Sequence, residues 1–357
     1  MPQGKNYVQE IGELIDVLIE ADASDLHLSE GRPPFIRSTG TLEPLSVRGT
    51  LDADDMEGFC IAFMGKERYA EFVEVKEMDF SYEHANGIRF RGNAFVRRGL
   101  VAIALRAISS KIRTLEELSL PKILETFARK KQGFFLTVGP VGQGKSTTLA
   151  ALIDLINRER MEHIVTIEDP IEYLFTEDKS IIDQREVRID TDSFPSALHS
   201  LFRQDINVAL IGEMRGPQTM SAAVTAAETG HLVFSTLHTN DAAQTIDRII
   251  DTFPAVQQQQ IRLQLAGSLL GVFSQRLIPR VAGGRVPAYE LLINNNAVAS
   301  LVREGRTHEI NVVIETSAQQ GMVSMNQSLA QLVRLGEITP DNAYVHSTDP
   351  KGLERLL

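Results

Sequence analysis

The sequence of 357 residues contains a single cysteine, Cys60, and no tryptophan. One cysteine excludes an intrachain disulfide framework and a four-cysteine zinc site. No segment approaches the roughly 18 apolar residues that a membrane span requires. The first residues, MPQGKNYVQE, lack the apolar core of a secretory signal. We therefore expect a chain without a membrane span that works in the reducing cytoplasm.

Positive charge and aromatic side chains are also scarce. Lysine and arginine number 36 against 47 aspartates and glutamates, the net charge is −11, and aromatic residues make up 6% of the chain. Proteins that bind nucleic acid usually carry a basic surface for phosphates and aromatic side chains for bases. The composition therefore argues against a direct nucleic-acid partner.

Two patterns divide the chain. Residues 1–109 mix short extended runs with helical stretches, which predicts an α+β domain, and the polar stretch 110–120 is expected to be a linker. In residues 121–357, apolar strand-like runs alternate with helices before a helical tail. Such alternation is typical of a mostly parallel sheet covered by helices, which binds ligands at the carboxyl ends of its strands.

The strongest motif is GPVGQGKST, which runs from Gly139 to Thr147 and matches G-x-x-x-x-G-K-[ST]. In this motif main-chain N–H groups surround a polyphosphate, Lys145 places its charge on the terminal phosphates, and the Ser146 hydroxyl binds Mg²⁺. An apolar strand before the motif and a helix after it supply the required context. The predicted nucleotide-binding residues are Gly139, Gly142, Gln143, Gly144, Lys145, Ser146 and Thr147.

Carboxylates follow two of the predicted strands. Glu213 ends the run VALIGE, while Glu168, Asp169 and Glu172 lie together in TIEDPIEY. Beside a phosphate loop, such a group can orient or deprotonate the attacking water. A glutamate exposed at a strand end and a solvated acidic loop are the plain alternatives. Gly212 stands where an aspartate commonly precedes the glutamate, and the sequence leaves open whether Glu213 or Glu172 is the general base.

Two histidines, His231 and His238, flank the run LVFSTL. An odd offset on a strand turns the two rings to opposite faces, which argues against a shared zinc ion. Each is either a polar sensor near the phosphates or a core histidine whose ring nitrogens are hydrogen bonded.

Arginines cluster in the first domain. Arg89 and Arg91 alternate onto one face of a predicted strand, Arg97 and Arg98 follow, and Arg106 lies in the next extended run. A solvated basic face is the ordinary interpretation of such a cluster. The alternative is that this domain offers guanidinium groups to a nucleotide bound by a neighbouring subunit.

Several motifs together resemble the secretion-type hexameric ATPases, and most of all the PilT-like family of type IV pilus retraction and twitching-motility motors. GPVGQGKSTT is similar to the Walker A loop of that family, TIEDPIEY to its Asp box, LIGEMR to its Walker B strand and AAETGHLVFSTLHTNDA to its His box. The likeness extends to RFRGNAF, QREV, SQRLIPR and AVASLVREGRTHEI, and so covers nearly the whole chain.

The resemblance implies a PAS-like α+β domain at the amino end, then a RecA-like P-loop ATPase core with a mostly parallel sheet and a helical tail. It implies a homohexamer that hydrolyses ATP with Mg²⁺ and converts hydrolysis into inter-subunit domain movement, driving pilus retraction. The implied partners are pilus platform components at the inner membrane, where the cytoplasmic motor is peripheral. The residues implied to act in catalysis are Glu213, Glu172, Glu168, His231 and His238, with Arg91 and Arg106 acting in trans.

Several positions depart from the family pattern. Gly216 replaces the acid after EMR, RQDIN stands where RQDPD is typical, and Arg188 occupies the glycine after QREV. These departures leave open a low-turnover, nucleotide-gated accessory subunit, or the ATPase of a related secretion system. Assembly and secretion ATPases of the family carry a zinc-binding tetracysteine segment. A single cysteine excludes that segment, so a retraction ATPase is favoured.

Overall fold

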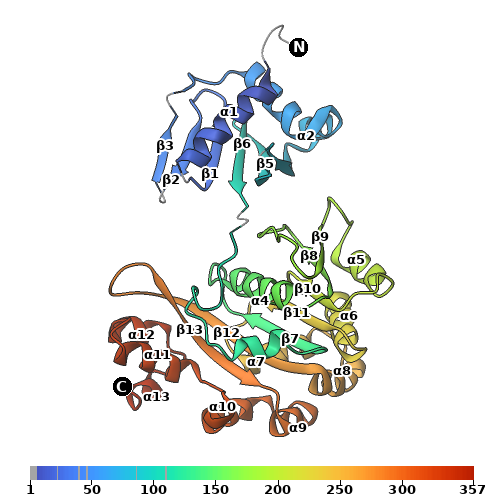
Figure 1. Ribbon diagram of the computed structural model, residues 1–357, viewed down its shortest axis with the longest axis vertical. Coiled ribbons are helices and arrows are strands. Elements are labelled where there is room, and N and C mark those ends of the chain that lie inside the picture. Colours follow the sequence, from blue (N-terminus) through green and yellow to red (C-terminus); the bar gives the residue numbers. More distant parts are fainter. Residues whose placement is uncertain (1–5, 22, 39–40, 46, 86, 109–110) are drawn as a thin grey trace. The chain divides into compact units, whose positions relative to one another are not determined.

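The computed structural model describes residues 6–21, 23–38, 41–45, 47–85, 87–108 and 111–357. The chain divides into two compact units, Met1–Ser110 and Lys111–Leu357 (Figure 1). Residues 111–120, expected as a linker, count with the second unit, because Leu115 and Leu120 are buried in its core. The expected domain boundary at 109 and 110 lies outside the described residues.

The first unit is a six-stranded sheet with strand order β3-β2-β1-β6-β5-β4. Its strands are β1 (Asp25–Ser29), β2 (Phe35–Ser38), β3 (Thr41–Pro44), β4 (Glu77–Glu83), β5 (Arg89–Arg97) and β6 (Leu100–Ala107). Helices α1 (Tyr7–Glu20) and α2 (Ala53–Val75) pack on it. Side chains alternate along each strand, so Leu26 and Leu28 enter the core beneath the helices while Asp25 lies on the other face.

Capping residues fix where these two helices begin. The Asn6 side chain accepts a hydrogen bond from Gln9 N at the start of α1. Asp52 and Asp55 form a reciprocal capping box at the start of α2. Each cap satisfies main-chain N–H groups that the helix itself leaves without partners.

The second unit is built on a seven-stranded sheet with strand order β13-β12-β7-β11-β10-β8-β9. Its strands are β7 (Gly133–Val138), β8 (His163–Glu168), β9 (Ile181–Glu186), β10 (Val208–Ile211), β11 (Leu232–Leu237), β12 (Leu269–Pro279) and β13 (Arg285–Ile293). The neighbours from β12 to β9 are parallel, and β13 alone pairs antiparallel. The predicted mostly parallel sheet is confirmed, whereas β9 and the β12–β13 hairpin were not predicted.

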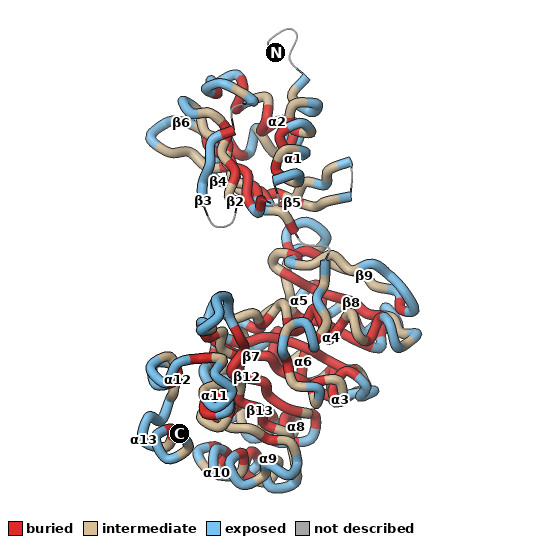
Figure 2. The backbone as a smooth tube through the Cα atoms, turned by 60° about the vertical axis from the view of Figure 1, so that its left-hand side comes forward, coloured by how far each residue is buried: buried red, intermediate tan, exposed pale blue. Residues whose placement is uncertain are grey.

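Helices cover both faces of this sheet. Along β7, Phe134 and Leu136 pack in one core cluster and Phe135 packs in another, so the strand is buried on both sides (Figure 2). The helices of the core are α3 (Leu124–Ala128), α4 (Lys145–Glu159), α5 (Phe194–Leu201), α6 (Pro217–Glu228), α7 (Ala242–Asp251) and α8 (Ala255–Ser268).

The carboxyl-terminal tail is helical, as predicted. Its helices are α9 (Asn296–Glu304), α10 (Ile310–Thr316), α11 (Met325–Arg334), α12 (Pro340–His346) and α13 (Pro350–Glu354). Within the described ranges, no helix has the length and apolar character needed to cross a membrane.

Parallel pairing places the carboxyl ends of the central strands at one edge of the sheet. Val138 pairs with Leu237, and Ile211 pairs with Ile167. The loops that follow β7, β8, β10 and β11 therefore begin close together, and these are the loops that carry the sequence motifs.

Candidate nucleotide-binding site

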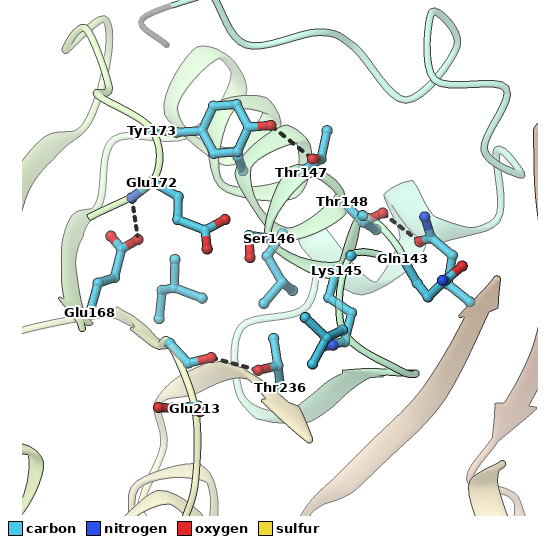
Figure 3. Close-up of a pocket in the computed structure, with 18 of the residues that line it drawn as sticks. Gln143, Lys145, Ser146, Thr147, Thr148, Glu168, Glu172, Tyr173, Glu213 and Thr236 are labelled. Carbon is cyan, nitrogen blue, oxygen red and sulfur yellow. Dashed lines mark hydrogen bonds between the residues drawn. The ribbon is translucent and has the colours of Figure 1, made fainter. Parts of the chain in front are cut away.

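A cavity of about 470 Å³ opens at this edge of the sheet. It is lined by the phosphate loop, the start of α4, the TIEDPIEY loop and the ends of β10, β11 and β12, all of the second unit. In Figure 3, Lys145, Ser146 and Glu172 project into this cavity. The structure thus brings together residues that lie far apart in the sequence.

The phosphate loop owes its shape to two glycines. Gly139 approaches β12 so closely that a Cβ would lie 2.4 Å from the main-chain oxygen of Gln275. Gly144 adopts a left-handed conformation, with φ of 81°, directly before α4 begins at Lys145. The first turn of α4 therefore faces the cavity, and unpaired N–H groups at a helix start favour a phosphate. The geometry fits the cradle that a polyphosphate requires.

Lys145 is buried at the base of this loop, only 7% exposed. Its Nζ donates hydrogen bonds to the main-chain oxygens of Gly139, at 2.8 Å, and Pro140, at 2.9 Å. The same atom lies 3.2 Å from Nδ1 of His238. Burial lowers the pKa of Lys145, and the nearby carboxylates of the cavity oppose that shift.

Glu213 follows β10 and lines the cavity opposite the phosphate loop (Figure 3). Its Oε1 lies 2.5 Å from Nη2 of Arg215, and its Oε2 lies 3.8 Å from Nε2 of His238. Burial and the charge of Lys145 lower the pKa of His238, so its ring is neutral at pH 7. His238 therefore stands between the ammonium and the carboxylate. The partner Arg215 was not predicted, although it lies in the motif LIGEMR.

Glu168 ends β8 and is 8% exposed. The Thr166 hydroxyl donates to its Oε1 at 2.7 Å, and the main-chain N–H of Glu172 lies 3.5 Å from its Oε2. Burial raises the pKa of Glu168 to about 7. Glu168 thus holds the loop that carries Glu172, whose carboxylate faces the cavity (Figure 3).

Two further side chains hold this loop, and neither was predicted. The Tyr173 hydroxyl lies 2.7 Å from Oγ1 of Thr147, a contact drawn in Figure 3. Gln184 on β9 donates to the main-chain oxygen of Tyr173 and accepts from the N–H of Phe175. The only sequence signal was their presence in TIEDPIEY and QREV.

Strand β12 holds the phosphate loop from the other side. The side-chain oxygen of Gln143 accepts a hydrogen bond from Leu277 N at 2.7 Å. The Thr148 hydroxyl donates to Gln275 at 2.6 Å. The side chain of Gln143, predicted to bind nucleotide, is therefore directed to β12.

The structure does not bring His231 to the cavity. It precedes β11, whose first residue pairs with the first residue of β7, so it lies at the opposite edge of the sheet from His238. Its Nδ1 is 3.0 Å from the main-chain oxygen of Ala226, and its ring contacts that of Phe202. Arg91 and Arg106 belong to the first unit and pair across β5 and β6.

Arg188, which replaces a glycine of the family pattern, keeps a left-handed backbone with φ of 71°. Its Nη2 lies 3.4 Å from Oδ2 of Asp169, a residue that lines the cavity. Gly216 serves as the N-cap of α6, so the departure after EMR preserves the helix.

Comparison with known proteins shows which family the chain belongs to. The family model described as Type II/IV secretion system protein matches residues 88–346. The chain belongs to this secretion ATPase family.

Relatives of this chain match it over most of its length. The type IV pilus retractation ATPase PilT of Pseudomonas aeruginosa is 41% identical over 342 residues, which cover 96% of this chain and 99% of the relative. A twitching motility protein of Neisseria gonorrhoeae is 45% identical over 312 residues, 87% of this chain and 83% of the relative.

A solved structure of the same family agrees with the fold. The crystal structure of the pilus retraction motor PilT with bound ADP has a TM-score of 0.91 at 44% identity, and the match covers 97% of this chain and 99% of that one. The predicted resemblance and fold class are confirmed, and the chain is a P-loop ATPase of the secretion family.

Proposed function

We propose that this secretion ATPase is the subunit of a hexameric motor that uses ATP hydrolysis to retract type IV pili. One observation carries the proposal: the phosphate loop, Lys145 and two carboxylates, Glu213 and Glu172, meet in one cavity of a chain that is similar to PilT along its whole length. A nucleotide site with carboxylates beside it is what hydrolysis requires.

Binding is assigned to the main chain of residues 139–147 and to Lys145. The Lys145 ammonium exchanges its two carbonyl acceptors for phosphate oxygens. The Ser146 hydroxyl lines the cavity beside Glu172 and Glu213, and such hard oxygen donors are those that Mg²⁺ prefers. When bound, Mg²⁺ neutralises charge on the terminal phosphates.

Hydrolysis is assigned to a carboxylate that orients water toward the γ-phosphate. Glu213 and Glu172 both face the cavity, whereas Glu168 is buried under the loop and carries a raised pKa, which suits a positioning role. Neutral His238 connects Lys145 to Glu213, so it senses whether the ammonium has turned to phosphate.

Neutralisation of the remaining charge on the phosphates is assigned to arginines of a neighbouring subunit. Arg91 and Arg106, which lie in the first unit, are the residues to which we assign this role, because their motif resembles that of the trans-acting arginines of the family. If each nucleotide site needs an arginine from the adjacent subunit, hydrolysis is coupled to movement between subunits. The motor would act on pilus platform components, from the cytoplasmic side of the inner membrane.

Steady-state ATP hydrolysis by the full-length protein, Lys145→Ala and Glu213→Gln tests this function. The wild type should hydrolyse ATP, Lys145→Ala should lose nucleotide affinity, and Glu213→Gln should bind nucleotide but turn it over slowly. A wild type no faster than Glu213→Gln would refute the motor.

The ion pair between Glu213 and Arg215 favours a second candidate function. A carboxylate held at 2.5 Å by a guanidinium is restrained from orienting water. This geometry suits a low-turnover, nucleotide-gated accessory subunit, or the ATPase of a related secretion system that a partner activates. A several-fold rise in turnover of the isolated Arg215→Ala protein would support this candidate, and a fall would exclude it.

A further inference from the structure

A row of polar side chains crosses the sheet of the first unit. The members are successive cross-strand partners on β2, β1, β6, β5 and β4: Arg37, Asp25, Arg106, Arg91 and Ser81. Directly paired residues of antiparallel strands project from the same face. The adjacent pair, Leu26 and Leu105, is fully buried in the core beneath the helices. These five residues, here called the charged row, therefore lie on the face turned away from α1 and α2.

Asp25 is the one acid of the charged row and is 6% exposed. Its Oδ1 accepts a hydrogen bond from Nε of Arg106 at 2.7 Å, and its Oδ2 accepts one from the Ser24 hydroxyl at 2.6 Å. Nε of Arg37 lies 3.9 Å from Oδ2. Burial acts to raise the pKa of Asp25, but the hydrogen bonds from Ser24 and Arg106 outweigh it, so the pKa lies below its ordinary value. The carboxylate is ionised at neutral pH.

The contact with Asp25 leaves the outer part of Arg106 accessible. The bond is made at Nε, the guanidinium nitrogen closest to the main chain, and the side chain is 71% exposed. A planar guanidinium held at one edge can present its other edge to an oxyanion. Arg91 lies directly opposite on β5, and like charges in that position repel. Asp25 therefore draws Arg106 away from Arg91.

We propose that Asp25 is a positioning residue for Arg106, fixing the guanidinium so that its terminal nitrogens meet the phosphates of the nucleotide bound by the neighbouring subunit. The proposal rests on the proposed function, in which Arg106 acts in trans. A long side chain that is ordered beforehand loses less rotamer freedom when the transition state forms. Asp25 itself touches no substrate.

A double-mutant cycle on the full-length protein tests this role. The variants are Asp25→Asn, Arg106→Ala and the double substitution, and Asp79→Asn is the matched control, an aspartate on β4 of the same sheet that accepts from Asn93. We expect Asp25→Asn to lower kcat on the order of 10²-fold, the effect of a misplaced group, with unchanged affinity for ATP. The double variant should be no slower than Arg106→Ala.

The outcomes separate the inference from the function beneath it. If Arg106→Ala is inactive but Asp25→Asn matches Asp79→Asn, positioning by Asp25 is wrong while the proposed function stands. If the two losses multiply in the double variant, Asp25 acts independently of Arg106 and the inference fails. A fully active Arg106→Ala would overturn both the trans role of Arg106 and the inference.

A milder variant keeps the test informative if Asp25→Asn does not fold. Ser24→Ala removes one hydrogen bond to Asp25 and retains the carboxylate. It should lower kcat by less than Asp25→Asn would, leave ATP affinity unchanged, and have no effect in the Arg106→Ala background. An equal loss of kcat with and without Arg106 would contradict positioning.

Discussion

The cavity of the second unit and the charged row of the first unit hold their charges in opposite ways. In the cavity, Lys145 and Glu168 are buried, and each is held by hydrogen bonds at the carboxyl edge of parallel strands. In the charged row, Asp25 is buried but Arg106 extends outward. The first arrangement suits binding, since it encloses a ligand. The second suits action on a ligand that another subunit holds. Substitutions in the cavity should therefore affect nucleotide affinity, turnover or both, whereas substitutions in the charged row should affect turnover alone.

The largest effect should come from Arg106→Ala. Loss of an arginine that stabilises the transition state lowers turnover on the order of 10³-fold. Nucleotide affinity should stay unchanged, because the residues that line the cavity all belong to the second unit. Steady-state kinetics and calorimetric titration with ADP give the two constants.

Arg97→Ala is the matched control for that loss. Arg97 lies on β5 of the same sheet, where its Nη2 donates to the main-chain oxygen of Glu30. This variant should keep full turnover. Weaker ADP binding by Arg106→Ala would remove the contrast between the two regions.

The histidines at the two ends of β11 should differ by a smaller factor. His238→Ala should lower kcat by about 10-fold, because it removes the ring that contacts both Lys145 and Glu213. His231→Ala should leave turnover and affinity of the isolated protein unchanged and lower its melting temperature, since it loses the contacts with Ala226 and Phe202. Equal kinetic losses would show that the opposite edge of the sheet also takes part in the chemistry.

Burial of Glu168 should make stability depend on pH. In the unfolded chain this carboxyl titrates near 4.5, while burial raises its folded pKa to about 7. Between these values the folded state retains a proton that the unfolded state has lost, so stability is highest below the ordinary pKa and declines as pH rises through 7. The unfolding free energy should fall by about 3 kcal/mol from this group.

Urea denaturation at pH 5 and pH 8 checks this dependence. Glu168→Gln should remove the decline that belongs to Glu168. Glu290→Gln is the control, because burial also raises the pKa of Glu290 to about 7, outside the cavity. Both variants should flatten the pH profile, but only Glu168→Gln should change turnover. Parallel profiles for wild type and Glu168→Gln would contradict the shift.

The smallest effect concerns Arg188. A non-glycine residue in the left-handed region is strained, so Arg188→Gly should be about 1 kcal/mol more stable than Arg188→Ala. Both variants lose the exposed contact with Asp169, which makes the comparison specific for the backbone. Equal melting temperatures would mean that the backbone has relaxed.

The parts of the fold that were predicted are those with local signals. Asp52, Ser193 and Asp241 are of residue types that favour helix starts, and each caps a helix. Strand β9 was missed because its side chains are mostly polar and it lies at the sheet edge. Strand β12 was missed because it begins at Leu269, directly after α8, with no turn residues between them.

In the candidate site, too, the residues within local motifs were predicted and the contacts between distant segments were not. The phosphate loop, Glu213 and the TIEDPIEY carboxylates were found because each motif is contiguous. The contacts of Gln143 with Leu277 and of Tyr173 with Thr147 join distant segments, so they depend on strand order that no local pattern contains. His231 was grouped with His238 by proximity in sequence, although a strand separates them.

The most direct test of the central claim mixes two variants that are each expected to be almost inactive alone. Glu213→Gln removes a carboxylate from the cavity, and Arg106→Ala removes the arginine that we propose is supplied to a neighbour. In mixed rings, a Glu213→Gln subunit can supply its intact Arg106 to the intact cavity of an Arg106→Ala subunit. The account predicts that ATP hydrolysis reappears on mixing and reassembly. A mixture as inactive as its components would contradict the claim that each cavity is completed by the adjacent subunit.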